Sequence, residues 1–392
     1  MADTSFGVND PLAVQAWGKK LYVEALRKTA AMKFMGTGAD ALIQIRDELS
    51  SGPGSKVTFG LRMQLSGTGV SGDGVLEGNE EALVRHNDSV QIDQLRHAVK
   101  VVGNMSQQRV PFNIRSEAES GLSDWWAGRI DTSIFNQLGG NSAANGTGTE
   151  RHNYTGMQAA VNPSSSRWIF ADVFENGSFN EAGNDENNIG LDTAGGTSTT
   201  KDAPFRLELI DRCVVKARTS SPPIRPLSLN GMECYAMFLH PHQVLQLRQN
   251  STAGQWLDIQ KAAMTGGLVS KNAIFTGALG MYNNTILHEA VRVPYGNDTQ
   301  VGADTGTDLG AAGNTTTGIA RAIFGGAQAA TVAFGRAYGW SGSNIRFKWT
   351  EVMDDYENQI GVSAALVWGC KKTVFNSTDF GTIVASTVSP GT

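Results

Sequence analysis

A strict two-residue alternation starting at residue 57 constrains the fold more than any other feature of the sequence. Because successive side chains of a strand point to opposite faces, the alternation predicts a strand with one covered face. Residues 67–81 follow with five glycines, four acidic residues and no basic residue, and residues 90–93 resume the alternation. We therefore predict a long hairpin with an acidic tip. The apolar positions of its first strand are Val57, Phe59, Leu61, Met63 and Leu65.

Two other segments have the period of a helix. After Pro111, apolar residues recur every four positions from Ile114 to Leu138, and the pair Gly139-Gly140 follows. A helix of this extent is roughly 37 Å long and is expected to end at the glycines. Near the start of the chain, Asn9-Asp10-Pro11 provides an N-cap and a first-turn proline for an amphipathic arm.

The remaining segments predict an α+β protein. Residues 139–202 are rich in Gly, Asn, Ser and Thr, which indicates surface loops around one apolar island at 167–174. A second folded block follows, with a helix from Leu207, a buried strand at 234–239, a helix from Pro241, and strands near Ile274 and Ile286. Another loop covers 296–318. The best strands near the C-terminus lie at 345–350 and 364–375.

Composition excludes several classes of protein. With 40% hydrophobic residues the chain can bury a large core, so outright disorder is excluded. A net charge of −5 argues against a protein whose main task is to neutralise phosphates. The three cysteines lack a CxxC spacing, and the best candidate for a membrane span, residues 322–335 between Arg321 and Arg336, is shorter than the ~20 residues that a bilayer requires. We expect no disulfide framework, no zinc ribbon, no signal peptide and no membrane association.

Chemical motifs are weak throughout. Residues 67–72 match GxGxxG, but no helical pattern begins at the third glycine, so a flexible hairpin tip is favoured over a dinucleotide site. His240-Pro241-His242 has no further histidine at a ligand spacing, and residues 185–196 lack the closing glutamate of a calcium loop. No phosphate-loop, zincin or hydrolase signature is present. We therefore predict no catalytic residue, no cofactor and no metal site, and a structural protein instead of an enzyme.

Several long segments resemble one protein family. FGVNDPLAVQAWGKKLYVEAL, KVTFGLRMQLSGTGVSGDGVLEGNEEAL, LELIDRCVV, FTGALGMYNNTILHE and DDYENQIGVSAALVWGCKKTVF are similar to the major capsid proteins of short-tailed bacteriophages. The resemblance implies the capsid fold shared by tailed phages and herpesviruses. It divides the chain into an N-terminal arm, an extended hairpin loop, a peripheral domain with a spine helix and a Gly/Asn-rich insertion, an axial domain, and C-terminal peripheral strands. The expected ranges are 1–52, 53–102, 103–204, 205–331 and 332–392.

The same resemblance implies a function. Many copies would form hexamers and pentamers of an icosahedral shell that encloses double-stranded DNA, with weak and nonspecific DNA contact because the net charge is −5. Implied partners are scaffolding, portal and decoration proteins. The implied locations are the virion capsid and, during assembly, the host cytoplasm. The alternatives are a surface binding module that uses the Asn/Gly-rich loops and an enzyme with an unrecognised site.

A capsid assembly gives the hairpin a partner for its apolar face. An isolated two-stranded hairpin is marginally stable, and burying apolar area contributes ~25 cal/mol per Å². We predict that the five apolar side chains of the first strand contact a neighbouring subunit. The alternative is that the hairpin packs on its own domain.

Overall fold

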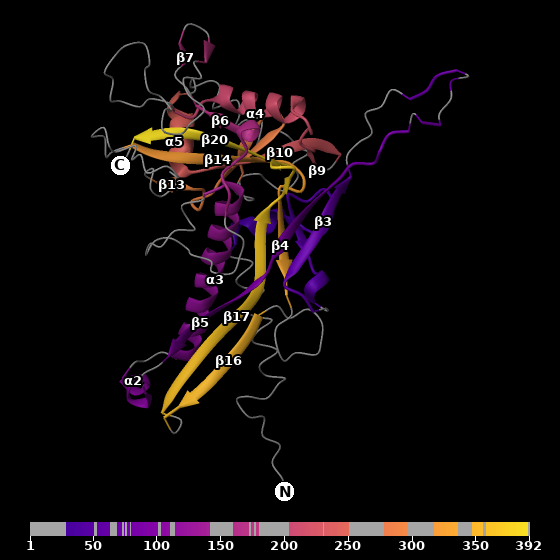
Figure 1. The fold of residues 1–392 in the computed structure, drawn as a ribbon. Coiled ribbons are helices and arrows are strands. Elements are labelled where there is room, and N and C mark those ends of the chain that lie inside the picture. Colours follow the sequence, from indigo (N-terminus) through magenta and orange to yellow (C-terminus); the bar gives the residue numbers. More distant parts are fainter. Residues whose placement is uncertain are drawn as a thin grey trace.

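The computed structural model shows an elongated α+β subunit from which a two-stranded hairpin projects (Figure 1). Residues 1–28, most of the predicted N-terminal arm, lie outside the described part of the chain, and so does the strand predicted near Ile274. The structure describes residues 29–50, 53–62, 69–72, 74, 77–78, 80–100, 103–109, 114–141, 160–171, 174–175, 178–179, 204–229, 231–250, 278–296, 317–335, 347–355 and 358–390.

The first sheet is built around the 14-residue strand β17 (Gln359–Lys372). β17 pairs with three strands, β15 (Ala330–Phe334), β16 (Phe347–Asp354) and β5 (Asp93–Lys100), all antiparallel. β2 (Ile43–Arg46) and β1 (Met35–Gly36) extend the sheet in parallel from β15. Together β16 and β17 form the long arm at the bottom of Figure 1.

The predicted spine helix is α3 (Ile114–Leu138). Every second residue of β17 from Val362 to Trp368 is buried and belongs to the same core cluster as Trp126, Ile130 and Ile134 of α3. The helix ends where the glycine pair predicts, because Gly140 has φ +62° and its N–H bonds to the carbonyl of Gln137 at 3.2 Å. One face of the first sheet is therefore covered by the chain's own spine.

The second sheet has the order β11 (Ala278–Tyr282), β12 (Thr285–Glu289), β10 (Met232–Leu239), β14 (Thr317–Gly325), β20 (Thr382–Pro390) and β6 (Trp168–Phe170). β9 (Leu227–Leu229) and β13 (Tyr295–Gly296) pair at its margins. Helices α4 (Leu207–Thr219) and α5 (Pro241–Asn250) begin at the predicted residues. Their apolar faces share a core with the sheet that includes Ile210, Cys213, Val244, Leu247, Met237 and Phe324.

The strand β20 joins two of the expected chain ranges. It pairs with β14 over nine residue pairs and with β6 in parallel, so part of the expected range 332–392 shares a sheet with part of the expected axial range 205–331. Ile383, Val384 and Ala385 are all buried, which is the pattern of a strand covered on both faces. This burial agrees with the place of β20 inside the second sheet, between β14 and β6.

The projecting hairpin consists of β3 (Lys56–Arg62) and β4 (Arg85–Gln91), paired antiparallel over seven residue pairs. β3 matches the alternation that predicted it, whereas the second predicted segment, residues 90–93, covers only the end of β4, the break at Ile92 and the first residue of β5. Two smaller hairpins, β18 (Val374–Phe375) with β19 (Thr378–Asp379) and β7 (Phe174–Glu175) with β8 (Ser178–Phe179), complete the strands. The short helices are α2 (Asn104–Arg109), η1 (Ala30–Phe34), η2 (Glu48–Ser50) and η4 (Ser165–Arg167).

Candidate assembly surfaces

The structure divides the five predicted hairpin contacts into three groups. Val57 is buried in its own chain, in a cluster with Leu49, Val90, Ile92 and Ala333. Phe59 and Leu61 are half-buried, and Phe59 packs against that cluster. Met63 and Leu65 lie outside the described residues. The base of the hairpin thus packs on its own domain, and the contact with a neighbouring subunit stays a prediction for the part beyond Val57.

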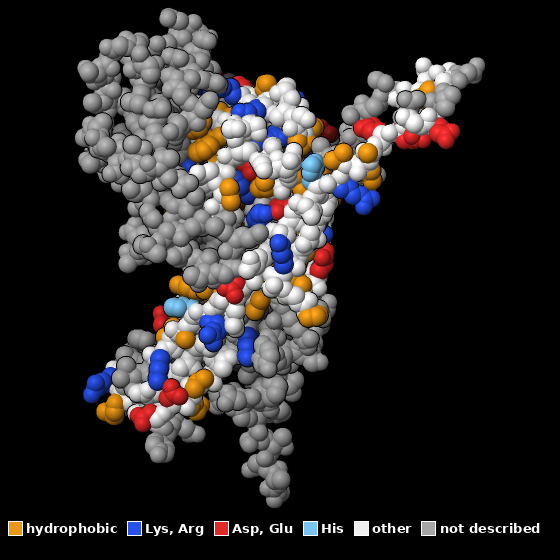
Figure 2. Space-filling model, in the orientation of Figure 1, with side chains coloured by type: hydrophobic (Ala, Val, Ile, Leu, Met, Phe, Trp, Pro, Cys, Tyr) orange, Lys and Arg blue, Asp and Glu red, His pale blue; other side chains and the backbone are white. Residues whose placement is uncertain are grey.

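Beyond that base, the hairpin exposes apolar and acidic side chains. Leu83 and Val84 are 46% and 51% exposed, although burial would stabilise both. Glu77, Glu80 and Glu81 are also exposed, and Figure 2 shows acidic side chains gathered along this projection. Adjacent exposed apolar residues on a thin projection are typical of a surface that another molecule covers.

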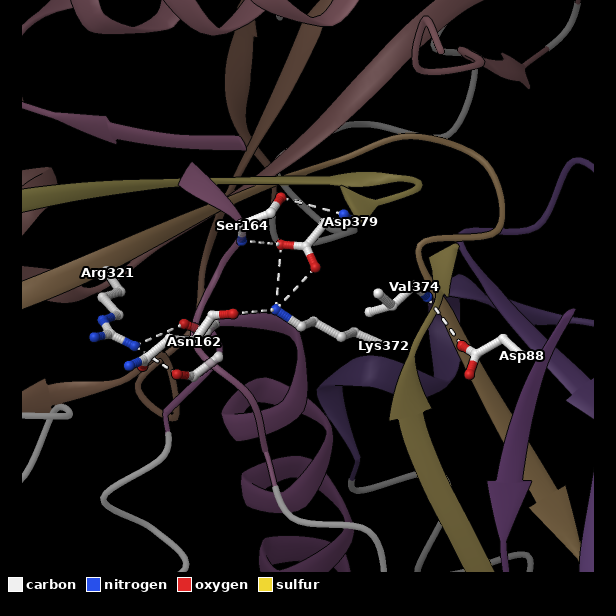
Figure 3. Close-up of polar contacts among 9 residues, drawn as sticks. Asp88, Asn162, Ser164, Arg321, Lys372, Val374 and Asp379 are labelled. Atoms are coloured by element: carbon white, nitrogen blue, oxygen red, sulfur yellow. Dashed lines mark hydrogen bonds and ion pairs between the residues drawn. The ribbon is translucent and has the colours of Figure 1, made fainter. Parts of the chain in front are cut away.

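A buried ionic junction joins the end of β17 to the rest of the subunit (Figure 3). The Lys372 ammonium lies 2.9 Å from the nearer Asp379 carboxylate oxygen and donates to the Asn162 carbonyl at 3.1 Å. Ser164 donates its N–H to the same carboxylate at 3.1 Å, and its hydroxyl accepts the Asp379 N–H. Burial lowers the pKa of Lys372, and the Asp379 carboxylate opposes this shift. The pair therefore ties the loop 160–167 to the β18–β19 hairpin.

A buried arginine connects the spine helix to the second sheet. Arg321 of β14 is fully buried and donates to the carbonyls of Gly139 and Gly140 at 3.1 and 2.6 Å. These carbonyls are at the C-terminus of α3, where the helix dipole favours a positive charge. The guanidinium also lies 4.9 Å from the Trp168 ring centroid. One side chain thus joins both sheets through the helix end.

The two histidines singled out in the sequence stack with Tyr295. The His240 ring lies 4.6 Å from the Tyr295 ring and 5.1 Å from the His242 ring, at interplanar angles of 7° and 17°. Parallel rings of this kind do not converge on one point as metal ligands must. Among the described residues no group of three potential ligands is close enough to hold a metal ion. Likewise, no helix in the described part of the chain is long and apolar enough to span a membrane.

Histidine 240 should make the subunit less stable in acid. Burial, helped by the nearby His242, lowers the pKa of His240 from 6.5 to about 4. A group with a depressed folded pKa contributes stability that is present above pH 6.5 and lost as the pH falls toward 4. We expect about 2 kcal/mol of this contribution to be lost between pH 7 and pH 5.

Urea unfolding of His240→Phe at both pH values measures this loss. Phenylalanine retains the ring stack without a titrating group, so the variant should lose about 2 kcal/mol less stability than the parent between pH 7 and pH 5. His86→Gln, which removes a half-buried histidine of the hairpin, is the control for the loss of a histidine elsewhere in the chain. Equal pH dependence of parent and His240→Phe would contradict the prediction.

Sequence reasoning missed the residues of the ionic junction. Lys372 and Asp379 belong to no motif, and their partner Asn162 is distant in sequence. Two adjacent lysines at the end of an apolar strand were the available signal, because alternation must turn one of them toward a covered face.

The arrangement of these parts defines a class of protein. A spine helix under an elongated sheet, a compact second sheet with two helices, and a projecting hairpin together make the capsid fold of tailed phages. The capsid of Ralstonia phage GP4 matches with a TM-score of 0.70 and 30% identity, over 99% of this chain and 98% of that one. The cyanophage Pam1 capsid has the same fold, with a TM-score of 0.68, 18% identity and 94% of both chains covered.

Sequence comparison identifies the family. A family model described as phage capsid protein matches residues 5–391, so the chain belongs to the phage capsid protein family. The major capsid protein of Pseudomonas phage KPP25 is 30% identical over 378 residues, which are 94% of this chain and 93% of that protein. The predicted resemblance, the α+β class and the tailed-phage capsid fold are confirmed.

Proposed function

We propose that the chain is the major capsid protein of a bacteriophage and that copies of it assemble through hexamers and pentamers into an icosahedral shell around double-stranded DNA. The observation that carries the proposal is similarity to a major capsid protein over nearly the whole chain. The exposed apolar residues of the projecting hairpin support it, since assembly would cover them. In this role the chain works by mutual burial of surfaces and needs no catalytic step.

Further partners belong to the same proposal. Scaffolding and portal proteins would act during assembly in the host cytoplasm, and a decoration protein would bind the finished shell. Contact with DNA would be weak and nonspecific, because the net charge is −5. Sequence-selective DNA binding by the purified protein that persists at high salt would contradict this part of the proposal.

Electron microscopy of the expressed protein tests the assembly. We expect shells or ring-shaped capsomers from bacteria that produce the chain, alone or together with the scaffolding protein of the same phage. A surface binding module or an enzyme would remain a small soluble species under both conditions. Absence of any assembly with the scaffolding protein present would therefore overturn the proposed function.

A further inference from the structure

Besides the apolar cluster that contains Val57, Val90 and Ile92, two contacts at its base fix the direction of the projecting hairpin. Within the described residues, β3 and β4 pair with each other and have no ladder to either large sheet. The chain leaves the hairpin at Ile92, whose N–H bonds to the carbonyl of Ser55 at 2.9 Å, and then enters β5 of the first sheet. A hairpin without sheet neighbours is held in place by what its base touches.

The first such contact is a close crossing of two backbones. A Cβ atom at Gly369 of β17 would lie 2.0 Å from the carbonyl oxygen of Gln91, which ends β4, and 3.2 Å from the Cα of Ile92. Only glycine permits this approach. The end of β4 therefore rests directly on the backbone of β17.

The second contact is made by one cross-strand residue pair of the hairpin. Phe59 of β3 is paired with Asp88 of β4, and both side chains contact β18. The Phe59 ring meets the Phe375 ring edge to face, with centroids 6.0 Å apart. The Asp88 carboxylate, 8% exposed as a residue, accepts the Val374 N–H at 2.9 Å and forms an ion pair with Lys371.

The strand β18, which contacts this residue pair, is held in place by the end of β17. The adjacent residues Lys371 and Lys372 at the end of β17 pair with carboxylates in different parts of the subunit, Asp88 on the hairpin and Asp379 on β19. Figure 3 shows Asp88 approaching Val374 while Lys372 and Asp379 form the buried ionic junction. Asp88 therefore ties the hairpin to a point that the core of the subunit holds.

We propose that Asp88, Lys371 and Val374 form a hairpin latch that sets the direction in which the hairpin leaves the subunit. Asp88 is a positioning residue for assembly. It orients the hairpin before a neighbouring copy binds, so the hairpin loses less conformational entropy on binding. Charge-assisted hydrogen bonds suit this task because they are directional as well as strong. The role in assembly rests on the proposed function, whereas the latch itself is a property of the single subunit.

Hydrogen exchange of the unassembled subunit tests the latch. In Asp88→Ala the amides of β3 and β4 should exchange about tenfold faster or more, because only the apolar contacts and the backbone crossing then hold the base of the hairpin and its strands open more often. Amides of α3 should exchange as in the parent. Gly369→Ala should have the same effect by a steric route. The matched control is Asp354→Ala, which removes the exposed carboxylate that pairs with Lys100 and should leave hairpin exchange unchanged.

Assembly of the same variants tests the role of the latch. We expect Asp88→Ala to give at least about tenfold fewer regular shells than the parent under conditions in which Asp354→Ala assembles normally. If Asp88→Ala folds poorly, Asp88→Asn keeps an oxygen for the Val374 N–H and should show smaller changes in the same direction. Unchanged hairpin exchange would overturn the latch, and faster exchange with a normal yield of shells would overturn its role in assembly. Failure of the parent to assemble would count against the proposed function alone, because the exchange measurement does not depend on it.

Discussion

Replacing Lys372 by methionine should lower the free energy of unfolding of the subunit by about 3–5 kcal/mol. The side chains of Lys372 and Asp379 are only 2% and 3% exposed, so water cannot solvate the carboxylate that the substitution leaves behind. The Asp379 carboxylate would retain the Ser164 N–H, but one neutral donor does not compensate a buried charge. Urea unfolding of the unassembled subunit, followed by circular dichroism, measures the loss.

Two further variants separate an unpaired charge from a loss of packing. The double variant Lys372→Met with Asp379→Asn removes both charges, and it should recover most of the stability because neither ion is left buried. Lys100→Met removes one partner of an ion pair whose side chains are 52% and 53% exposed, and it should cost less than about 1 kcal/mol. A Lys372→Met subunit within about 1 kcal/mol of the parent would show that the junction is not a major source of stability.

Local patterns predicted the elements that local physics determines. The alternation from Val57 predicted β3, and the four-residue apolar period with its closing glycines predicted a spine helix that the structure begins at Ile114 and ends at Leu138. In both cases the side-chain period and a glycine were sufficient signals, since each acts within a few residues. The starts of α4 and α5 were predicted for the same reason.

Pairing between distant strands was not predictable in this way. Residues 382–388 are buried one after another, so both faces of the strand are covered, but this pattern does not say which sheet the strand joins. The partner of β20 is β14, and the two strands are separated by β15 to β19 in sequence. The pairing of β20 with β14 depends on how the two hydrophobic cores pack, and the sequence of one segment does not determine that packing.

The residues that position the hairpin could not be predicted from the sequence for a related reason. Asp88 and Lys371 are 283 residues apart, and each is an ordinary charged residue within a strand. Gly369 looked like one of 46 glycines in a loop-rich chain, although the crossing of β4 over β17 requires it. Such residues acquire their role only when two segments meet, so a sequence without a known structure does not single them out.

A carboxylate at position 61 of the hairpin should abolish assembly while the subunit still folds. Leu61 lies beyond Val57 on the same face of β3 and is half-buried, whereas Phe59 packs in its own chain. Leu61→Asp is therefore a cleaner test than a change at Phe59. If a neighbouring subunit covers this position, each contact would bury an unpaired carboxylate at a cost of several kcal/mol. The cost recurs in every copy, so we expect the yield of shells to fall below detection.

The matched control is Thr58→Asp, which places the same charge on the exposed, opposite face of β3. Its shells should form normally if the neighbour contacts only the apolar face. Sedimentation should find Leu61→Asp as unassembled subunits or capsomers, and its far-ultraviolet circular dichroism should match that of the parent. Normal shells from Leu61→Asp would show that the hairpin face is covered by its own subunit, as Val57 is. Loss of assembly in both variants would instead indicate that the neighbour surrounds the whole hairpin, because only burial on both faces makes both charges costly.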